Sequence, residues 1–428
     1  MSLRNRELLH LLLVGVLTGL GFASVYIAQQ EIISTASLTY LGFFLGLYLA
    51  AHVVTRIALP FADPYLLPLA ALLTGIGLTM IYRIEPELAL RQGVWLVVGI
   101  GVFAVCALLV RDYRSLDHVK WILGTCAVVL LVLPAVPGLG ETVNGSSLWI
   151  ELGPIRFQPG EVAKVLMVVF LAGYLRDKRE VLTTGLGRFG LPPLKHFGPL
   201  LVIWGAAMLV LFQTNDLGGG LLYFSVFLAM LYLATARWQY VAVGTLLFAA
   251  GAYGLYHVVP HVQDRVQIWL DPWHDPYDTG YQLVQSIYAI SSGGLFGTGL
   301  GRGVLIGTDG TTYIPFLQTD FIYSALAQEL GLAGGAAVIV LYIVLVYRGL
   351  RIAMLADDGF SKLLAAGLTA TIGIQAFIIL GGVTGLIPLT GITLPFVSYG
   401  GSSLVANFVV LWLLLAVSNR VNARSAGR

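Results

Sequence analysis

The sequence predicts an all-α polytopic membrane protein. Its mean hydropathy is +0.86, 57% of the 428 residues are hydrophobic and only 11% are charged, whereas about a quarter of the residues of a soluble domain are charged. The apolar residues gather in runs of about 20, the length at which a helix crosses a hydrocarbon core. We therefore expect about 12 transmembrane helices, at roughly 7–28, 38–59, 64–83, 93–110, 119–138, 161–175, 197–214, 218–235, 238–259, 318–347, 363–386 and 396–418.

The first run is expected to be a retained helix. It is too long and unbroken for the apolar core of a cleaved signal, and no small-residue cleavage site follows a short core. Both cysteines, Cys106 and Cys126, fall inside apolar runs. Their positions argue against a disulfide framework or a cysteine metal site.

The basic residues predict the orientation of these helices. With the N-terminus in the cytoplasm, 18 of the 24 Lys and Arg residues fall in cytoplasmic segments. Such an excess is what the positive-inside rule requires, and a miscounted early span would invert it. We therefore expect both termini to be cytoplasmic and the long segment 260–317 to lie outside.

Two outer segments are long enough to carry function, 139–160 and 260–317. Within the second, residues 281–292 place Leu283, Ile287 and Ile290 on one stripe and Ser286 on the opposite side, which predicts a short amphipathic helix. The glycine-rich stretch at 291–303 has no preceding strand, so a dinucleotide-binding turn is not expected.

Charged and amide side chains gather at the outer ends of several predicted helices. Glu161 and Lys164 begin the sixth, Asp216 precedes the eighth, and Asp320 and Glu329 lie on the tenth. Ionisable groups at membrane depth usually face a wet cavity or each other. An intrahelical ion pair for Glu161 and Lys164, and helix capping for Asp216 and Asp320, are the alternatives that require no ligand.

An outward-opening cavity with these carboxylates and with Lys164, Arg156 and Arg302 suits a substrate with an anionic head and a lipid tail, because Arg and Lys bind phosphate groups. Glycosyl transfer from a lipid diphosphate needs only one carboxylate. The leaving group is already a stable anion, so the paired acid and base of a glycosidase are not both required.

Five stretches resemble the SEDS family, which includes the RodA and FtsW proteins of bacterial wall elongation and division. They are VNGSSLWIELGPIRFQPGEVAKVLMV (143–168), NDLGGG (215–220), DPWHDPYDTGYQLVQSIYAISSGGLFGTGLG (271–301), TDFIYSALAQELGLAG (319–334) and GLIPLTGITLPFVSYGGSS (385–403). The resemblance implies a ten-helix bundle and polymerisation of lipid II into peptidoglycan strands. It begins near residue 64, so we expect two additional N-terminal helices (1–60), a SEDS core (61–420) and a cytoplasmic tail (421–428).

Carried over by position, the family's essential aspartate in the large outer loop falls on Asp275, which we expect to be the general base. The resemblance further implies a substrate-binding cavity, and the residues assigned to it are Trp149, Arg156, Gln158, Glu161, Lys164, Asp216, Arg302 and Ser398. Relatives often have Pro-Glu-Ala-His before Thr-Asp-Phe. Here Pro315 is followed by Phe316, Leu317 and Gln318, so any role of that acid and histidine is not transferred.

The expected partners are lipid II, the nascent glycan strand, the membrane and a class B penicillin-binding protein, with no nucleic acid. No metal-binding residue is assigned, and a divalent cation, Mg or Mn, is left open as a cofactor. Two other functions are considered: a flippase for lipid-linked precursors, and a scaffold without catalytic activity. A flippase favours charged groups at mid-membrane in two matching halves, whereas the sequence shows no internal repeat and little charge in the centres of the spans.

Overall fold

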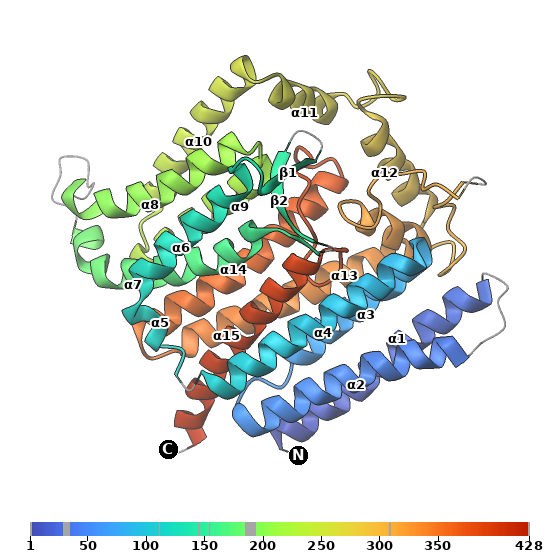
Figure 1. Ribbon diagram of the computed structural model, residues 1–428, viewed down its shortest axis with the longest axis horizontal. Coiled ribbons are helices and arrows are strands. Elements are labelled where there is room, and N and C mark those ends of the chain that lie inside the picture. Colours follow the sequence, from blue (N-terminus) through green and yellow to red (C-terminus); the bar gives the residue numbers. More distant parts are fainter. Residues whose placement is uncertain are drawn as a thin grey trace.

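The computed structural model describes residues 2–28, 35–110, 112–143, 146–153, 155–184, 194–307 and 310–426. The chain is mostly helical (Figure 1). Its elements are α1 (Leu3–Ala28), α2 (Thr35–Ala58), α3 (Leu66–Ile84), α4 (Pro86–Leu109), α5 (Ser115–His118), α6 (Lys120–Val132), η1 (Leu133–Ala135), β1 (Gly140–Val143), β2 (Ser146–Leu152), β3 (Ile155–Phe157), α7 (Pro159–Thr184), α8 (Leu194–Gln213), α9 (Leu217–Thr235), α10 (Trp238–Val258), α11 (Pro260–Leu270), α12 (Tyr281–Ser292), α13 (Ile322–Leu355), α14 (Gly359–Val383) and α15 (Gly401–Ala426).

The predicted all-α membrane fold is confirmed, and each predicted span overlaps one helix. Within the described part of the chain, nine helices are long and apolar enough to cross a membrane. Two of the other three, α6 and α8, form shorter apolar helices. The third, α7, begins at Pro159 and carries Glu161 and Lys164 in its first two turns.

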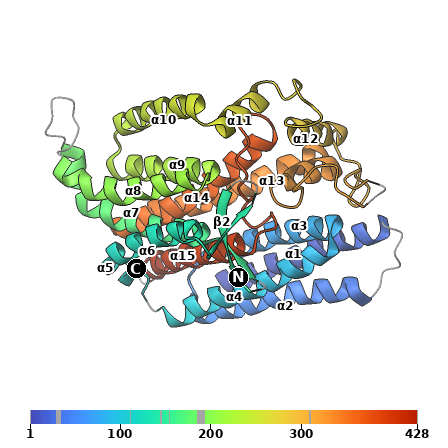
Figure 2. The ribbon, with the colours of Figure 1, turned by 45° about the horizontal axis from the view of Figure 1, so that its top comes forward.

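Helices α3, α14 and α15 form the centre of the bundle, because most of their residues are buried by other helices. In contrast, α10 lies at the edge of the bundle (Figure 2), and none of its most apolar stretch is buried. Close packing at the centre depends on small residues. A side chain at Gly77 of α3 would overlap the backbone of Val397.

Helices α1 and α2 pack beside α3 and α4 and contain a buried polar cluster of their own. Glu7 is fully buried and accepts hydrogen bonds from Arg4 Nη1 at 2.5 Å and from His52 Nδ1 at 2.6 Å. A buried carboxylate is stable only when it is paired. Because Arg4 lies on α1 and His52 on α2, the pairing of Glu7 joins the two helices.

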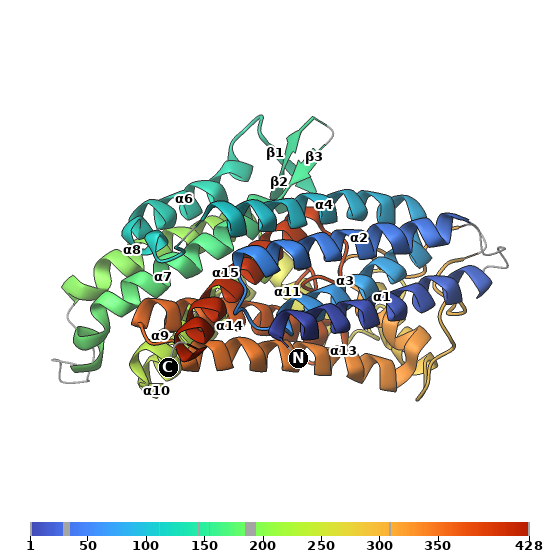
Figure 3. The same cartoon turned by 90° about the horizontal axis from the view of Figure 1, so that it is seen from below.

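A three-stranded antiparallel sheet interrupts the helical chain between α6 and α7, in the order β1-β2-β3. The sequence had suggested only a loop at 139–160. The sheet projects from one side of the bundle, as Figure 3 shows. Its register places Glu141 opposite Trp149 and Glu151 opposite Arg156.

The segment between α10 and α13 contains two helices. The predicted amphipathic helix is confirmed as α12, and α11 was not predicted. The expected orientation of Ser286 was wrong. Its side chain is buried and its hydroxyl lies 2.8 Å from Ser324 Oγ and 2.9 Å from the carbonyl of Val383, because α13 and α14 cover that side. Helices α11 and α12 lie at the end of the molecule opposite the two termini (Figure 1).

Candidate active site

A buried ion pair lies at the start of α7. Glu161 and Lys164 are 8% and 4% exposed, and Lys164 Nζ is 2.7 Å from Glu161 Oε2. The same ammonium donates to Gln375 Oε1 of α14 at 2.7 Å, and Gln375 Nε2 donates to the carbonyl of Thr393 at 2.7 Å. The intrahelical pair therefore exists, but it also links α7, α14 and the segment 384–400.

Asp216 caps α9, as the alternative without a ligand predicted. Its Oδ1 accepts a hydrogen bond from the Gly219 backbone N–H at 2.6 Å. Burial raises the pKa of Asp216 to about 6, and the nearby Glu161 carboxylate raises it further, while the Gly219 N–H, Arg265 and Lys164 oppose the shift. These interactions bring Asp216 and the Glu161–Lys164 pair into one electrostatic cluster.

Asp320 joins this cluster through Arg265 of α11. It precedes α13 but does not cap it, since the N-cap residue is Phe321. Burial raises the pKa of Asp320 to about 6, opposed by Arg265 and by a hydrogen bond with Thr319. The Arg265 guanidinium interacts electrostatically with both Asp320 and Asp216 and donates to the carbonyl of Leu389 at 2.7 Å. One arginine thus lies among two carboxyls whose pKa is raised to about 6 by burial.

Asp275 lies in the turn between α11 and α12 and is half-buried. Its Oδ2 accepts hydrogen bonds from the backbone N–H of Thr279 at 3.4 Å and from the Thr279 hydroxyl at 3.3 Å. It lines an open cavity of about 300 Å³, together with Asp264, Asp271 and His274. The described lining of this cavity includes no Lys or Arg side chain.

Helix α11 separates the acidic cavity from the Arg265 cluster. Asp264, Gln267 and Ile268 line the cavity. The other face of α11 carries Arg265 and Trp269 and contacts the segment after α14. Arg265 donates to the carbonyl of Leu389, and Trp269 Nε1 donates to the carbonyl of Gly385 at 3.0 Å. Successive helical residues point about 100° apart, so neighbouring residues reach different surroundings.

The remaining predicted residues lie apart from one another in four places. Ser398 is buried, accepts from the Leu394 N–H at 2.9 Å and donates to the carbonyl of Thr319 at 2.5 Å. Trp149 and Gln158 are half-buried, and the Gln158 N–H donates to Ser402 Oγ at 2.9 Å. Arg156 is exposed.

The structure thus brings Glu161, Lys164 and Asp216 together and places Asp275 in a neighbouring cavity. Arg156 pairs with Glu141 at 2.8 Å and with Glu151 at 3.2 Å on the sheet. Arg302 is exposed in the segment after α12.

Arg265 and Gln375 were not among the predicted site residues. The signal for Gln375 was available, because it is an amide inside the long apolar run 363–386, where polar side chains usually bond to a neighbouring helix. Arg265 gave no such signal. Its role depends on α11, which the hydropathy pattern did not predict.

Among the described residues, no group of three His, Cys, Asp or Glu side chains is arranged to hold a metal ion. The described side chains therefore do not form a three-ligand site for a resident metal. Asp264, Asp271 and Asp275 line one cavity, but they are not arranged to bind a single metal ion together.

Comparison with known proteins gives consistent matches. The family model for FtsW, RodA and SpoVE, described as cell cycle proteins, matches residues 65–423. The peptidoglycan glycosyltransferase RodA of Mycobacterium tuberculosis is 41% identical over 97% of this chain and 90% of its own.

Solved structures are also similar. One reports the structural coordination of polymerization and crosslinking by a peptidoglycan synthase complex, and a chain in it has a TM-score of 0.70 and 27% identity over 84% of this chain and 98% of its own. The rod shape determining protein RodA of Thermus thermophilus has a TM-score of 0.60 and 25% identity, over 83% of this chain and 96% of its own.

Proposed function

Because this chain belongs to the FtsW, RodA and SpoVE family, the family that its motifs resemble, we propose that it is a peptidoglycan glycosyltransferase that polymerises lipid II. The 41% identity to a RodA glycosyltransferase covers 97% of the chain, so it includes the outer segments as well as the apolar helices. It is an enzyme of the glycosyltransferase class and an integral membrane protein.

We propose inverting transfer with Asp275 as the general base. Its carboxylate removes the proton from the 4-hydroxyl of the GlcNAc in the acceptor lipid II. The hydroxyl oxygen attacks the anomeric carbon of the MurNAc at the lipid end of the growing strand. The bond from that carbon to the diphosphate oxygen breaks, and undecaprenyl diphosphate leaves with the electron pair.

The observation that carries this assignment is the place of Asp275 on an open cavity, where Thr279 holds its carboxylate. A cavity lined by acids suits a neutral hydroxyl that must lose a proton, and it disfavours a diphosphate. Arg265 and Lys164 lie across α11 among the carboxyls of Glu161, Asp216 and Asp320, so they do not line the cavity that holds Asp275.

A divalent cation remains part of the proposal as a companion of the substrate. Mg²⁺ is commonly held by substrate phosphates and only one or two carboxylates. Such binding does not require three protein ligands. The transfer above is written without a step through the cation.

We propose that both termini are cytoplasmic and that α11, α12 and the Asp275 cavity face outward. The three-to-one excess of basic residues in the expected cytoplasmic segments supports this orientation. The two termini lie at one end of the bundle and α11 and α12 at the other (Figure 1).

We further propose a class B penicillin-binding protein as partner, which would crosslink the strands made here. A similar solved structure concerns a complex that coordinates polymerization and crosslinking. Co-purification of the two membrane proteins tests this partner directly.

Polymerisation of lipid II by the purified protein, with and without that partner, tests the function. Asp275→Asn retains the shape and removes the base, so we expect the rate to fall about 10²- to 10⁴-fold. Asp278→Asn is the matched control, because Asp278 is exposed three residues away and is not part of the cavity lining. Polymerisation by Asp275→Asn at the wild-type rate would show that Asp275 is not the base.

A further inference from the structure

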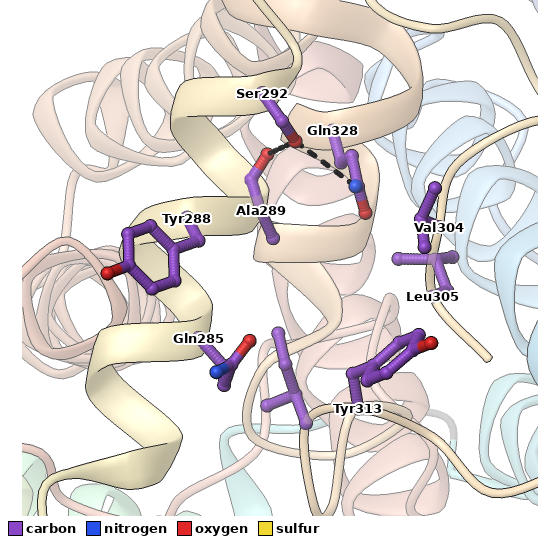
Figure 4. A pocket seen from close by; sticks show the side chains of 9 residues that line it. Gln285, Tyr288, Ala289, Ser292, Val304, Leu305, Tyr313 and Gln328 are labelled. Carbon is purple, nitrogen blue, oxygen red and sulfur yellow. Dashed lines mark hydrogen bonds between the residues drawn. The ribbon is translucent and has the colours of Figure 1, made fainter. Parts of the chain in front are cut away.

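A second open cavity, of about 240 Å³, lies between α12, residues 304–305 and 313–314, and the start of α13. Figure 4 shows Gln285 and Tyr288 of α12 on one side, Val304 and Tyr313 on the other, and Gln328 of α13 between them. Nothing in the proposed transfer uses this cavity.

Gln328 is only 5% exposed, and its amide has a fixed orientation. Its Nε2 lies 3.1 Å from Ser292 Oγ, and the Ser292 hydroxyl donates to the carbonyl of Ala289 at 2.8 Å. Because that hydroxyl proton is already used, Ser292 must accept from the amide nitrogen. The oxygen Oε1 then points into the cavity (Figure 4), and within the described part of the chain it has no hydrogen-bond partner.

A buried amide oxygen without a donor costs free energy, so it favours a ligand that brings an O–H or N–H group. None of the described lining residues is charged, which favours a neutral ligand over a phosphate or a carboxylate. Tyr288 and Tyr313 are 54% and 42% exposed at the rim, where their rings offer flat apolar faces. A neutral ring with several hydroxyls and one apolar face has these properties.

The cavity lies beside the turn that carries Asp275. The Trp273 ring, two residues before Asp275, contacts the Tyr288 ring edge to face at 5.5 Å between centroids. Trp273 is itself 48% exposed. An aromatic surface therefore continues from the Asp275 turn to the rim of the second cavity.

We propose that this cavity is a carbohydrate-binding subsite that holds one sugar ring of the glycan strand, with Gln328 Oε1 accepting a hydrogen bond from a sugar hydroxyl or acetamido N–H. The assignment to the glycan strand rests on the proposed function. The neutral polyhydroxylated ligand class rests on the cavity alone. Residues of this subsite position the strand and take no part in the proton transfer at Asp275.

Titration calorimetry of the purified full-length protein with chitotetraose, a neutral oligomer of N-acetylglucosamine, tests the proposal. We expect saturable binding by the wild type. Gln328→Met retains the size of the side chain and removes the acceptor, so the dissociation constant should rise about three- to tenfold. Tyr288→Leu, at an exposed position that folding tolerates, should also weaken binding.

The matched controls are Gln263→Met on α11 and Tyr347→Leu on α13, neither of which lines the cavity. Both should bind chitotetraose like the wild type. Absence of wild-type binding at millimolar saccharide means that the cavity holds water only and overturns the proposal. Equal binding by Gln328→Met and Tyr288→Leu overturns it as well.

The binding measurement involves no turnover, so it is independent of the polymerisation assay. A protein that polymerises lipid II but does not bind chitotetraose refutes the subsite and leaves the proposed function intact. A protein that binds chitotetraose through Gln328 but does not polymerise lipid II refutes the proposed function and leaves the carbohydrate site intact.

Discussion

Replacing Lys164 with Met is expected to lower the free energy of unfolding by about 3–5 kcal/mol, the usual cost of breaking a buried ion pair. Lys164 is 4% exposed, and its ammonium lies 2.7 Å from both Glu161 Oε2 and Gln375 Oε1. Methionine fills the space of the lysine stem but leaves the Glu161 carboxylate, which is 8% exposed, without its cation.

The double variant Glu161→Gln/Lys164→Met removes both charges together. It should lose less stability than the sum of the two single variants, with a coupling free energy of about 2 kcal/mol. Unfolding of the four proteins in one detergent at neutral pH measures this cycle. Lys178→Met, at a half-exposed position further along α7, controls for loss of a lysine. Wild-type stability of Lys164→Met, or strict additivity in the cycle, would refute the reasoning.

Two further variants test other parts of the structure. Burial raises the pKa of Asp320 from an ordinary 3.8 to about 6, so the folded protein binds that proton more tightly than the unfolded chain does. The free energy of unfolding should therefore fall by at most about 3 kcal/mol as the pH rises from about 4 to about 6. Asp320→Asn removes this contribution, so unfolding curves of the variant should depend less on pH over that range, and unchanged dependence would contradict the assignment. Gly77→Ala should cost about 1–3 kcal/mol, because the new methyl overlaps the Val397 backbone. Gly101→Ala on α4, where a methyl meets open space, is its control, and equal unfolding temperatures for the two would show that the contact is unimportant.

The positions of the helices could be predicted because hydropathy over about 20 residues depends only on local sequence. Asp216 as a cap and the Glu161–Lys164 pair were also predictable, since both are contacts within a few residues. The polar partner Gln375 lies on another helix, more than 200 positions further along the chain. Only tertiary packing brings it to Lys164.

The differences between expectation and structure in the outer segments have a similar cause. The stripe on α12 was predicted from apolar residues alone, but the serine hydroxyls of Ser286 and Ser324 meet in the interface, where they satisfy each other. Arg156 was expected in a cavity with the other basic residues. The sheet instead places it between Glu141 and Glu151, and neither the strands nor their register follow from composition.

Helix α11 has two different faces, so the rotation of the helix about its own axis decides which charged residue lies on each side. The composition of the helix does not decide it. Asp264 and Arg265 are adjacent in the chain, yet the first reaches the acidic cavity and the second reaches Asp216 and Asp320. Pro260 fixes that rotation by starting the helix. A shift of one residue in the register of α11 would place Asp264 where Arg265 now lies, and would bring an acid to Asp216 and Asp320 without altering a single charged side chain.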